Sequence, residues 1–321
     1  MRLNRRSLLL GGALAGTAFT GCTATPGTRT VIGLTYIPNV QFCAFYHAID
    51  AGLFSRAGLD VELRHHGAQE GLFTALEAGQ EQVVLASVDE AVLAAAEGLG
   101  GLRVFASCYR SYPGHVLGGP VVRDLSELAG RRLGVPGRYG SSWLTALAAL
   151  DRAGLAVTDV EIVEIGWTQV AALTSGKVDA VVGFVNNEAV QLEQLGFDAA
   201  VLEVVDPEAP ELLGPGLMTL ADRVDSATLA RIVEVVTEAE QQIAADPSKG
   251  MEATLARVPT LTEPAQRATA ERVLAATIAL WQGAAGIDLT VPAGALARMG
   301  EFLNEAGVIQ QVPEQLLLEL P

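Results

Sequence analysis

Aromatic and amide side chains follow the first predicted strand of the chain. The turn at residues 36–39, Tyr-Ile-Pro-Asn, comes just past that strand. A tyrosine ring offers a flat π face, and an asparagine offers both a hydrogen-bond donor and an acceptor. Tyr36 and Asn39 therefore predict contact with a flat, polar ring, with core packing as the alternative for Tyr36. Phe42 and Tyr46, at helical spacing just beyond, either line the same wall or pack in the core, and packing is the favoured interpretation.

A second group of polar residues follows the near-continuous apolar strand predicted at 178–184. Asn186, Asn187 and Glu188 stand at its carboxyl end. Two amides and a carboxylate are costly to bury without partners, so we expect these side chains to hydrogen-bond a ligand, with Glu188 as the main polar contact. The alternative is that Asn187 caps the next helix and that Glu188 only favours its first turn.

Two other strand ends in the first half of the chain carry candidate contacts. His65 and His66 are adjacent, and neighbouring residues of a strand point to opposite faces, so only one of them faces inward. We take His66 as a candidate ligand contact, with a surface position as the favoured alternative. Ser87 ends a strand and starts a helix, where capping and ligand contact are compatible.

A glycine-rich turn at 136–142 joins a strand to the start of a helix. Free backbone N–H groups and the helix dipole at such a start favour an anionic or carbonyl-bearing ligand group. The turn has neither the P-loop lysine nor the GxGxxG spacing. Tyr139 could stack on the far side of a ring held by Tyr36, and Trp167 after another strand is either a stacking residue or core. The candidates here are Tyr139, Gly140, Ser141 and Trp167.

The cysteine spacing predicts no metal site. The three cysteines, Cys22, Cys43 and Cys108, form neither a CxxC pair nor a zinc-type Cys/His pattern. Cys43 and Cys108 either pair or remain buried thiols, and free thiols are favoured because both lie in apolar surroundings. Lysine occurs only at Lys177 and Lys249, which leaves few candidates for Schiff-base chemistry. We expect no cofactor and no catalytic residue.

Alternating strands and helices position these side chains. Strand-like runs lie at 31–36, 59–64, 83–86 and 102–109, and helical runs at 42–51, 71–78 and 90–97. This order predicts an α/β fold with a mostly parallel sheet covered by helices on both faces. Ligands of such sheets sit at the carboxyl ends of the strands, where the candidate residues are found.

A second α/β unit begins near Pro120. Its strands are expected at 132–135, 160–165, 178–184 and 201–205, its helices at 140–153, 170–175 and 188–195, and further helices at 227–245, 264–281, 292–306 and 313–320. Short segments near 112–119 and 203–219 join the units. The pattern predicts two lobes with a hinge and a cleft between them, lobe 1 at 31–112 plus 216–321 and lobe 2 at 117–205.

The amino terminus is typical of an export signal. Residues 1–21 contain three arginines followed by an apolar run at 8–19, which is too short to span a bilayer. Small residues precede Cys22 as in a bacterial lipobox, so we expect cleavage there, lipidation of Cys22, and a tether over 22–30. The Arg5-Arg6 pair is compatible with either the twin-arginine or the Sec route. The protein is then expected at the outer face of the cytoplasmic membrane, in contact with it only through the anchor.

The charge excludes one class of partner. The formal net charge is −16 over 321 residues, with a pI of about 4.6. An acidic surface repels phosphate backbones, so no nucleic-acid partner is expected.

Several runs together resemble a known family. They are the turn and helix at 34–39 and 45–48, the run 52–61 (GLFSRAGLDV), and the run 176–183 (GKVDAVVG). These resemble solute-binding proteins similar to thiamine-pyrimidine synthase, a superfamily shared with alkanesulfonate- and nitrate-binding proteins. The resemblance covers about residues 30 to 225.

The resemblance implies a type II periplasmic-binding-protein fold and a role in transport. Its partners would be a small heteroaromatic ligand and the permease and ATPase of an ABC importer, with the binding protein itself a monomer and not an enzyme. A family glutamate after the corresponding strand accepts hydrogen bonds from ring N–H or amino groups, which implies that role for Glu188. A thiamine-type aminopyrimidine is the expected ligand and riboflavin the alternative. Sulfonate or nitrate binding and a pyrimidine-synthase-like enzyme are less favoured.

Overall fold

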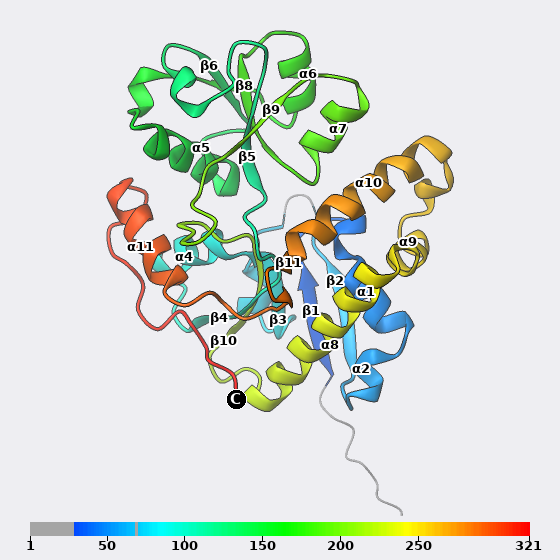
Figure 1. Cartoon of the computed structure of the whole chain (residues 1–321). Helices are drawn as coiled ribbons and strands as arrows, with labels where there is room; N and C mark the ends of the chain where they lie inside the picture. Colours follow the sequence, from blue (N-terminus) through cyan, green and yellow to red (C-terminus); the bar gives the residue numbers. More distant parts are fainter. Residues whose placement is uncertain (1–28, 68–69) are drawn as a thin grey trace, which may run out of the picture.

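Two lobes, each built on a five-stranded sheet, make up the protein (Figure 1). The computed structural model describes residues 29–67 and 70–321. The predicted signal peptide and the lipidation of Cys22 therefore lie outside the described residues. The α/β class and the two-lobed architecture expected from the sequence are confirmed, while the lobe boundaries at 31–112 plus 216–321 and at 117–205 stay a prediction.

Lobe 1 carries the sheet β2-β1-β3-β10-β4. Its strands are β1 (Thr30–Leu34), β2 (Val61–His65), β3 (Val83–Ser87), β4 (Leu102–Ser107) and β10 (Pro215–Leu220). The helices before the crossing to lobe 2 are η1 (Val40–Phe42), α1 (Cys43–Asp50), α2 (Leu53–Arg56), α3 (Thr74–Glu77) and α4 (Val88–Ala96). The elements after β10 are α8 (Ser226–Ala245), α9 (Pro247–Leu255), η4 (Pro259–Thr262), α10 (Pro264–Trp281), β11 (Gln282–Gly283), β12 (Gly286–Ile287) and α11 (Ala295–Glu305).

Lobe 2 carries the sheet β7-β6-β8-β5-β9. Its strands are β5 (Gly114–Gly118), β6 (Arg132–Val135), β7 (Glu161–Glu164), β8 (Ala180–Phe184) and β9 (Ala200–Glu203). Its helices are η2 (Leu125–Leu128), α5 (Gly140–Ala153), η3 (Val157–Asp159), α6 (Gln169–Thr174) and α7 (Glu188–Gln194).

Both segments predicted as simple connections contain a strand. β5 lies within 112–119 and pairs antiparallel with β8 and β9, while the segment 203–219 runs into β10, which pairs antiparallel with β3 and β4. Each sheet is therefore mixed rather than nearly all parallel. Glycine and proline are depleted in strands, and their presence in both segments hid the strand signal.

The prediction of a carboxyl-terminal helix at 313–320 is wrong. The chain there is extended beside β4: the Val104 N–H donates to the Leu316 carbonyl at 2.8 Å, and the Leu318 N–H donates to the Val104 carbonyl at 2.9 Å. Leu316 is buried whereas Leu317 is 43% exposed. The leucines were read as a helical face, but here they alternate between the core and the solvent as in a strand.

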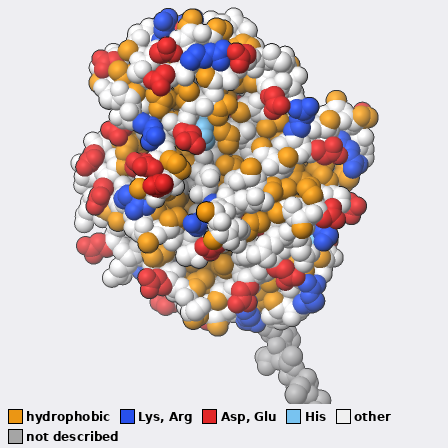
Figure 2. Space-filling model, viewed as in Figure 1, with side chains coloured by type: hydrophobic (Ala, Val, Ile, Leu, Met, Phe, Trp, Pro, Cys, Tyr) orange, Lys and Arg blue, Asp and Glu red, His pale blue; other side chains and the backbone are white. Residues whose placement is uncertain are grey.

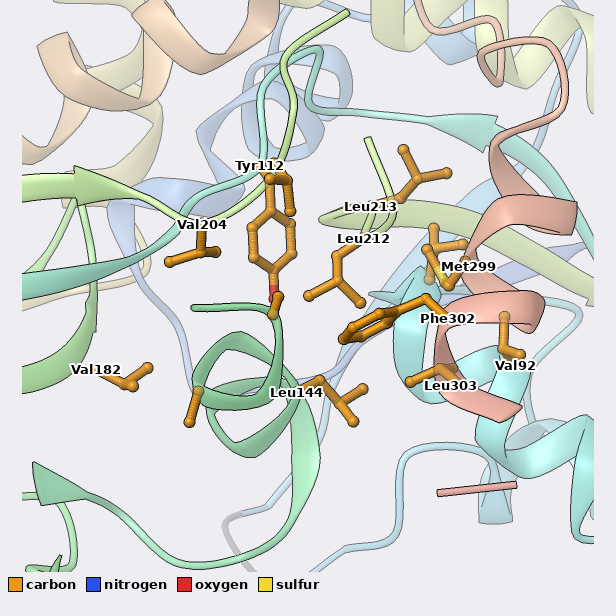
Figure 3. Close-up of a cluster of buried hydrophobic side chains, with 14 of the residues drawn as sticks. Val92, Tyr112, Leu144, Val182, Val204, Leu212, Leu213, Met299, Phe302 and Leu303 are labelled. Carbon is orange, nitrogen blue, oxygen red and sulfur yellow. The ribbon is translucent and has the colours of Figure 1, made fainter. Parts of the chain in front are cut away.

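One hydrophobic cluster crosses from lobe 1 to lobe 2 (Figure 3). It contains Val92 of α4, Leu144 of α5 and Phe302 of α11, with Tyr112 of the β4–β5 connection among them. Such packing ties the lobes together beside the crossing segments. In the view of Figure 2, hydrophobic side chains gather over the middle of the molecule, and charged side chains of both signs are spread over the rest of this face.

Candidate functional site

Three aromatic side chains at strand ends are more than half exposed. Tyr36, after β1 of lobe 1, is 54% exposed, and in lobe 2 Tyr139 after β6 and Trp167 after β7 are 59% and 71% exposed. Large apolar rings are normally covered. These three are left open at the carboxyl ends of strands, where sheets of this kind commonly bind ligands, so they are candidates for stacking. Core packing is excluded for all three rings.

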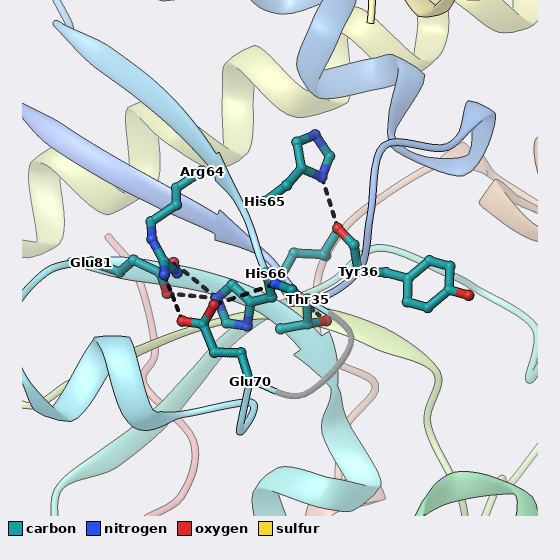
Figure 4. A network of polar contacts seen from close by, with 9 residues as sticks. Thr35, Tyr36, Arg64, His65, His66, Glu70 and Glu81 are labelled. Atoms are coloured by element: carbon teal, nitrogen blue, oxygen red, sulfur yellow. Dashed lines mark hydrogen bonds and ion pairs between the residues drawn. The ribbon is translucent and has the colours of Figure 1, made fainter. Parts of the chain in front are cut away.

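The turn that carries Tyr36 is fixed from behind. The Thr35 hydroxyl donates to the Leu85 carbonyl at 2.8 Å, and the His65 Nδ1–H donates to the Tyr36 carbonyl at 2.8 Å. Since Nδ1 carries the proton, His65 Nε2 accepts from the Tyr46 hydroxyl at 2.9 Å. Burial lowers the pKa of His65, in keeping with a neutral ring. Figure 4 shows the Tyr36 ring pointing away from this network, which leaves its faces free.

Asn39 and Phe42 support the same turn. The Asn39 Oδ1 accepts from the Gln41 N–H at 3.1 Å and so caps η1, and the Phe42 ring packs edge-on against His65 with 5.5 Å between ring centroids. Tyr46 is buried, as the packing interpretation predicted. Ligand contact by Asn39 and Phe42 stays a prediction.

His66 faces the interior, and its neighbour His65 is the more exposed of the two. The His66 Nε2 lies 2.9 Å from Glu81 Oε1, and Arg64 bridges Glu81 at 2.7 Å to Glu70 at 2.6 Å (Figure 4). The favoured alternative of a surface position is wrong for His66, because the buried Glu81 carboxylate requires partners inside the fold. Gly33 of β1 leaves room for that carboxylate, which a Cβ there would overlap.

The β6–α5 turn brings lobe 2 into contact with lobe 1. Gly140, the first residue of α5, has a φ of +61° and faces Glu90 of α4, where a Cβ would lie 2.9 Å from Glu90 Oε1. The Ser141 hydroxyl donates to Asp89 Oδ1 at 2.8 Å. The first turns of α4 and α5 therefore meet, and Ser87 occupies the N-cap position of α4 as predicted, without a side-chain capping bond.

Asp89 and Glu90 are two adjacent acidic residues in the first turn of α4. Asp89 is fully buried and accepts from the Glu90 N–H at 2.7 Å and from the Tyr112 hydroxyl at 3.3 Å, besides Ser141. The Tyr112 hydroxyl also pairs with Thr145 at 2.8 Å. Burial raises the pKa of Asp89, and burial together with the neighbouring Asp89 charge raises that of Glu90. The position of two carboxyls after a strand was visible in the sequence, but their partners lie far along the chain.

Asn186, Asn187 and Glu188 are bound to neighbours in the fold. The Glu188 Oε2 accepts from the Phe184 N–H at 2.8 Å, and its Oε1 accepts from Asn187 Nδ2 at 2.8 Å. The Asn186 Nδ2 donates across to the Thr277 hydroxyl of α10 at 3.0 Å. Glu188 is 8% exposed, and burial raises its pKa. Asn187 occupies the N-cap position of α7 without capping it, so ligand contact by this group stays a prediction.

Two surface pockets lie away from the exposed rings. One of about 590 Å³ borders β9 and contains His115 and Arg152, and one of about 410 Å³ borders β2 and contains His65 and Arg257. Neither has Tyr36, Tyr139 or Trp167 in its lining.

The described residues contain no group of three or more His, Cys, Asp or Glu side chains able to hold a metal ion. Cys43 and Cys108 are free and buried, and burial raises the pKa of both thiols. Within 29–67 and 70–321, no helix is long and apolar enough to cross a membrane.

Comparison with known proteins decides the family. The family described as NMT1/THI5-like matches residues 39–250, which is more than half of the chain. The chain belongs to this family. The matched region of this NMT1/THI5-like protein runs from Asn39 through all of lobe 2 and into α9. It includes the candidate residues after the strands of lobe 2 and after β2 and β3, but not Tyr36 after β1.

Two curated relatives are identical to this family member at about a third or fewer of the aligned positions. The riboflavin-binding protein RibY of Chloroflexus aurantiacus is 32% identical over 199 residues, covering 60% of this chain and 56% of the relative. The formylaminopyrimidine-binding protein of Halalkalibacterium halodurans is 28% identical over 181 residues, covering 56% of this chain and 54% of the relative. The chain thus matches a little over half the length of each relative.

A solved structure of low sequence identity has the same fold. The periplasmic aliphatic sulphonate-binding protein SsuA of Escherichia coli aligns with a TM-score of 0.71 at 16% identity, covering 91% of this chain and 92% of that chain. The architecture of this NMT1/THI5-like protein is therefore that of periplasmic binding proteins.

Proposed function

We propose that this protein is the substrate-binding component of an ABC importer for a flat heteroaromatic metabolite. The observation that carries the proposal is the set of three exposed rings, Tyr36 from lobe 1 and Tyr139 and Trp167 from lobe 2, at the ligand-binding edges of the two sheets. Rings presented by both lobes can hold a flat ligand from two sides when the lobes close. The names of the two curated relatives, which bind riboflavin and a formylaminopyrimidine, support this class.

Within this class we place riboflavin first and a thiamine-type aminopyrimidine second. The riboflavin-binding relative is the more similar of the two, at 32% against 28% identity. Three rings also offer more stacking surface than a single pyrimidine covers. The family resemblance had favoured the pyrimidine, with Glu188 as the main polar contact, but both oxygens of that carboxylate already have partners within lobe 2.

A sulfonate is a poorer candidate despite the shared fold. An anionic headgroup needs free N–H donors or cations, and helix starts can supply the former. Here the starts of α4 and α5 meet, and Asp89 and Glu90 fill that junction. The buried Asp89 carboxylate at this junction repels a second anion. Arg138 of the same turn lies 3.6 Å from Glu164 and over the Trp143 ring, so it is engaged elsewhere.

The transport cycle follows from the two-lobed architecture. The open lobes would admit the ligand between the rings, and closure would present a new surface to a membrane permease driven by its ATPase. Export and anchoring through a lipidated Cys22 would keep the binding protein beside that permease, as a monomer. No catalytic role is proposed: Lys177 is exposed in the loop that precedes β8, away from the carboxyl ends of the strands, and Lys249 lies in α9.

Calorimetry on the purified chain tests the proposal. Riboflavin, hydroxymethylpyrimidine and ethanesulfonate are titrated separately, after mass spectrometry of any ligand released on denaturation. We expect binding of a flat ring, and roughly tenfold or more loss of affinity in Tyr36→Ala and in Trp167→Ala, because one stacking face is removed. Leu195→Ala, which also truncates an exposed apolar side chain of lobe 2, serves as the control. Tight binding of ethanesulfonate alone would overturn the proposal.

A further inference from the structure

The Tyr139 ring rests on a glycine two residues earlier in the same turn. A Cβ at Gly137 would overlap Tyr139 Cε1 and would lie 2.8 Å from Cδ1 and 3.1 Å from Cζ. One edge of the ring therefore covers the Gly137 backbone, while 59% of the side chain stays exposed. This contact exists only because residue 137 has no side chain.

The backbone around the ring is fixed on both sides. Gly137 itself is buried after β6, and Tyr139 is followed by Gly140, whose φ of +61° starts α5 against Glu90. With the backbone held, the ring has little freedom except rotation about its own side-chain bonds. On one side, the Gly137 backbone lies directly against the ring and blocks its rotation in that direction.

A methyl group at 137 would move the ring and not the backbone. The overlapping atoms belong to the far end of a side chain that is mostly in solvent, so the ring can turn away at little cost to folding. We therefore expect Gly137→Ala to move the ring without lowering the free energy of unfolding, unlike most substitutions in a core.

We propose that Gly137 is a positioning residue for ligand binding, holding the Tyr139 ring as a pre-set stacking surface at the edge of lobe 2. The inference rests on the proposed function and names a further specificity-determining position within it. A ring already in place loses less freedom when the ligand binds, so flat heteroaromatic ligands are favoured over flexible ones.

A double-mutant cycle tests this assignment. Affinities for riboflavin and for hydroxymethylpyrimidine are measured by calorimetry in the wild type, Gly137→Ala, Tyr139→Ala and the double variant. We expect Gly137→Ala to weaken binding of the ring ligand three- to tenfold, and to have no further effect once Tyr139 is alanine. Tyr139→Phe should bind nearly as the wild type does, since the ring remains.

Gly100→Ala is the matched control. Gly100 is exposed, has an ordinary φ and has nothing within 4 Å of a built Cβ, so it reports the general effect of replacing glycine by alanine. Melting temperatures of all variants should stay close together. An unchanged affinity in Gly137→Ala, or an equal loss in the Tyr139→Ala background, would refute the positioning role while leaving the function intact. A wild type that binds no flat ring would instead sink the proposed function.

Discussion

At the scale of single residues, the buried Glu188 carboxylate hydrogen-bonds the end of β8 to the start of α7. It accepts from the Phe184 N–H and from Asn187, and it is 8% exposed. Removing it leaves a backbone donor without its partner in a half-buried place. We expect Glu188→Ala to lower the free energy of unfolding by about 1–3 kcal/mol. Urea denaturation measures this, with Glu193→Ala on the same helix as control.

Glu193 is a demanding comparison because it also has a partner. Its carboxylate lies 3.4 Å from Arg272, but the side chain is 73% exposed, so its loss should cost under about 0.5 kcal/mol. Equal losses in the two variants would show that the Glu188 hydrogen bonds stabilise the fold no more than an exposed ion pair does.

The raised pKa of Glu90 predicts that the stability of the fold depends on pH. Burial and the adjacent Asp89 raise its pKa to about 8, so the folded chain holds a proton that the unfolded chain releases nearer pH 4.5. Stability should therefore fall as pH rises through this window, because the folded state binds more protons there. Melting curves from pH 5 to 8 should show a decline that is smaller in Glu90→Gln. The exposed Glu97, at the other end of α4, provides the control substitution Glu97→Gln, whose decline should match the wild type.

Position along a strand was enough to select Tyr36, Tyr139 and Trp167, because all three follow strands. The structure leaves these rings exposed, and their contact with a ligand stays a prediction. Sequence could not show that Glu188 has satisfied its oxygens locally, since a pattern does not reveal hydrogen-bond partners. The Asp89–Ser141 bond joins residues 52 positions apart, and only the tertiary fold brings them together.

At the scale of elements, the alternating core strands and the long helices were predictable from periodicity. α10 begins and ends where the apolar spacing placed it, at 264 and 281. β5 and β10 were missed because glycines and a proline interrupt their apolar pattern. Their strand conformation is imposed by neighbours on both sides, and such tertiary pairing overrides local preference.

The carboxyl-terminal segment allows a test of whether its side chains alternate between the core and the solvent. Leu316 is 6% exposed and packs inward beside β4, whereas the next residue, Leu317, is 43% exposed. We expect Leu316→Ala to destabilise the protein by about 2 kcal/mol or more, through lost burial and the cavity left behind. Leu317→Ala should change stability by less than about 0.5 kcal/mol. Equal losses would favour a helical packing of both leucines over the extended one.

At the scale of the whole molecule, the lobes are joined by more than the two crossing segments. The cluster around Tyr112 packs α4, α5 and α11 together, and the Asp89–Ser141 bond lies at the junction of α4 and α5. Asn186 of lobe 2 also donates to Thr277 of α10. Because these contacts flank the crossing segments, we expect them to limit how far the lobes open rather than to break on every cycle.

Ser141→Ala tests this limit on lobe opening. Without the hydroxyl, the buried Asp89 carboxylate loses one donor and keeps Tyr112 and the Glu90 N–H, so the arrangement in which α4 and α5 touch is weakened by about 1 kcal/mol. The ligand-free variant should therefore populate more open conformations. Small-angle X-ray scattering should give it a larger radius of gyration than the wild type, for which a compact chain of this length predicts about 20 Å.

Ser126→Ala is the matched control for this experiment, since the Ser126 hydroxyl also donates to an aspartate, Asp124, but within lobe 2 alone. It should scatter as the wild type does. Saturating ligand should bring Ser141→Ala back toward the wild-type radius, because binding energy from rings on both lobes favours the closed state. If ligand-free Ser141→Ala is as compact as Ser126→Ala, the Ser141–Asp89 bond does not restrain the lobes. The packing around Tyr112 and the Asn186–Thr277 bond would then set their angle.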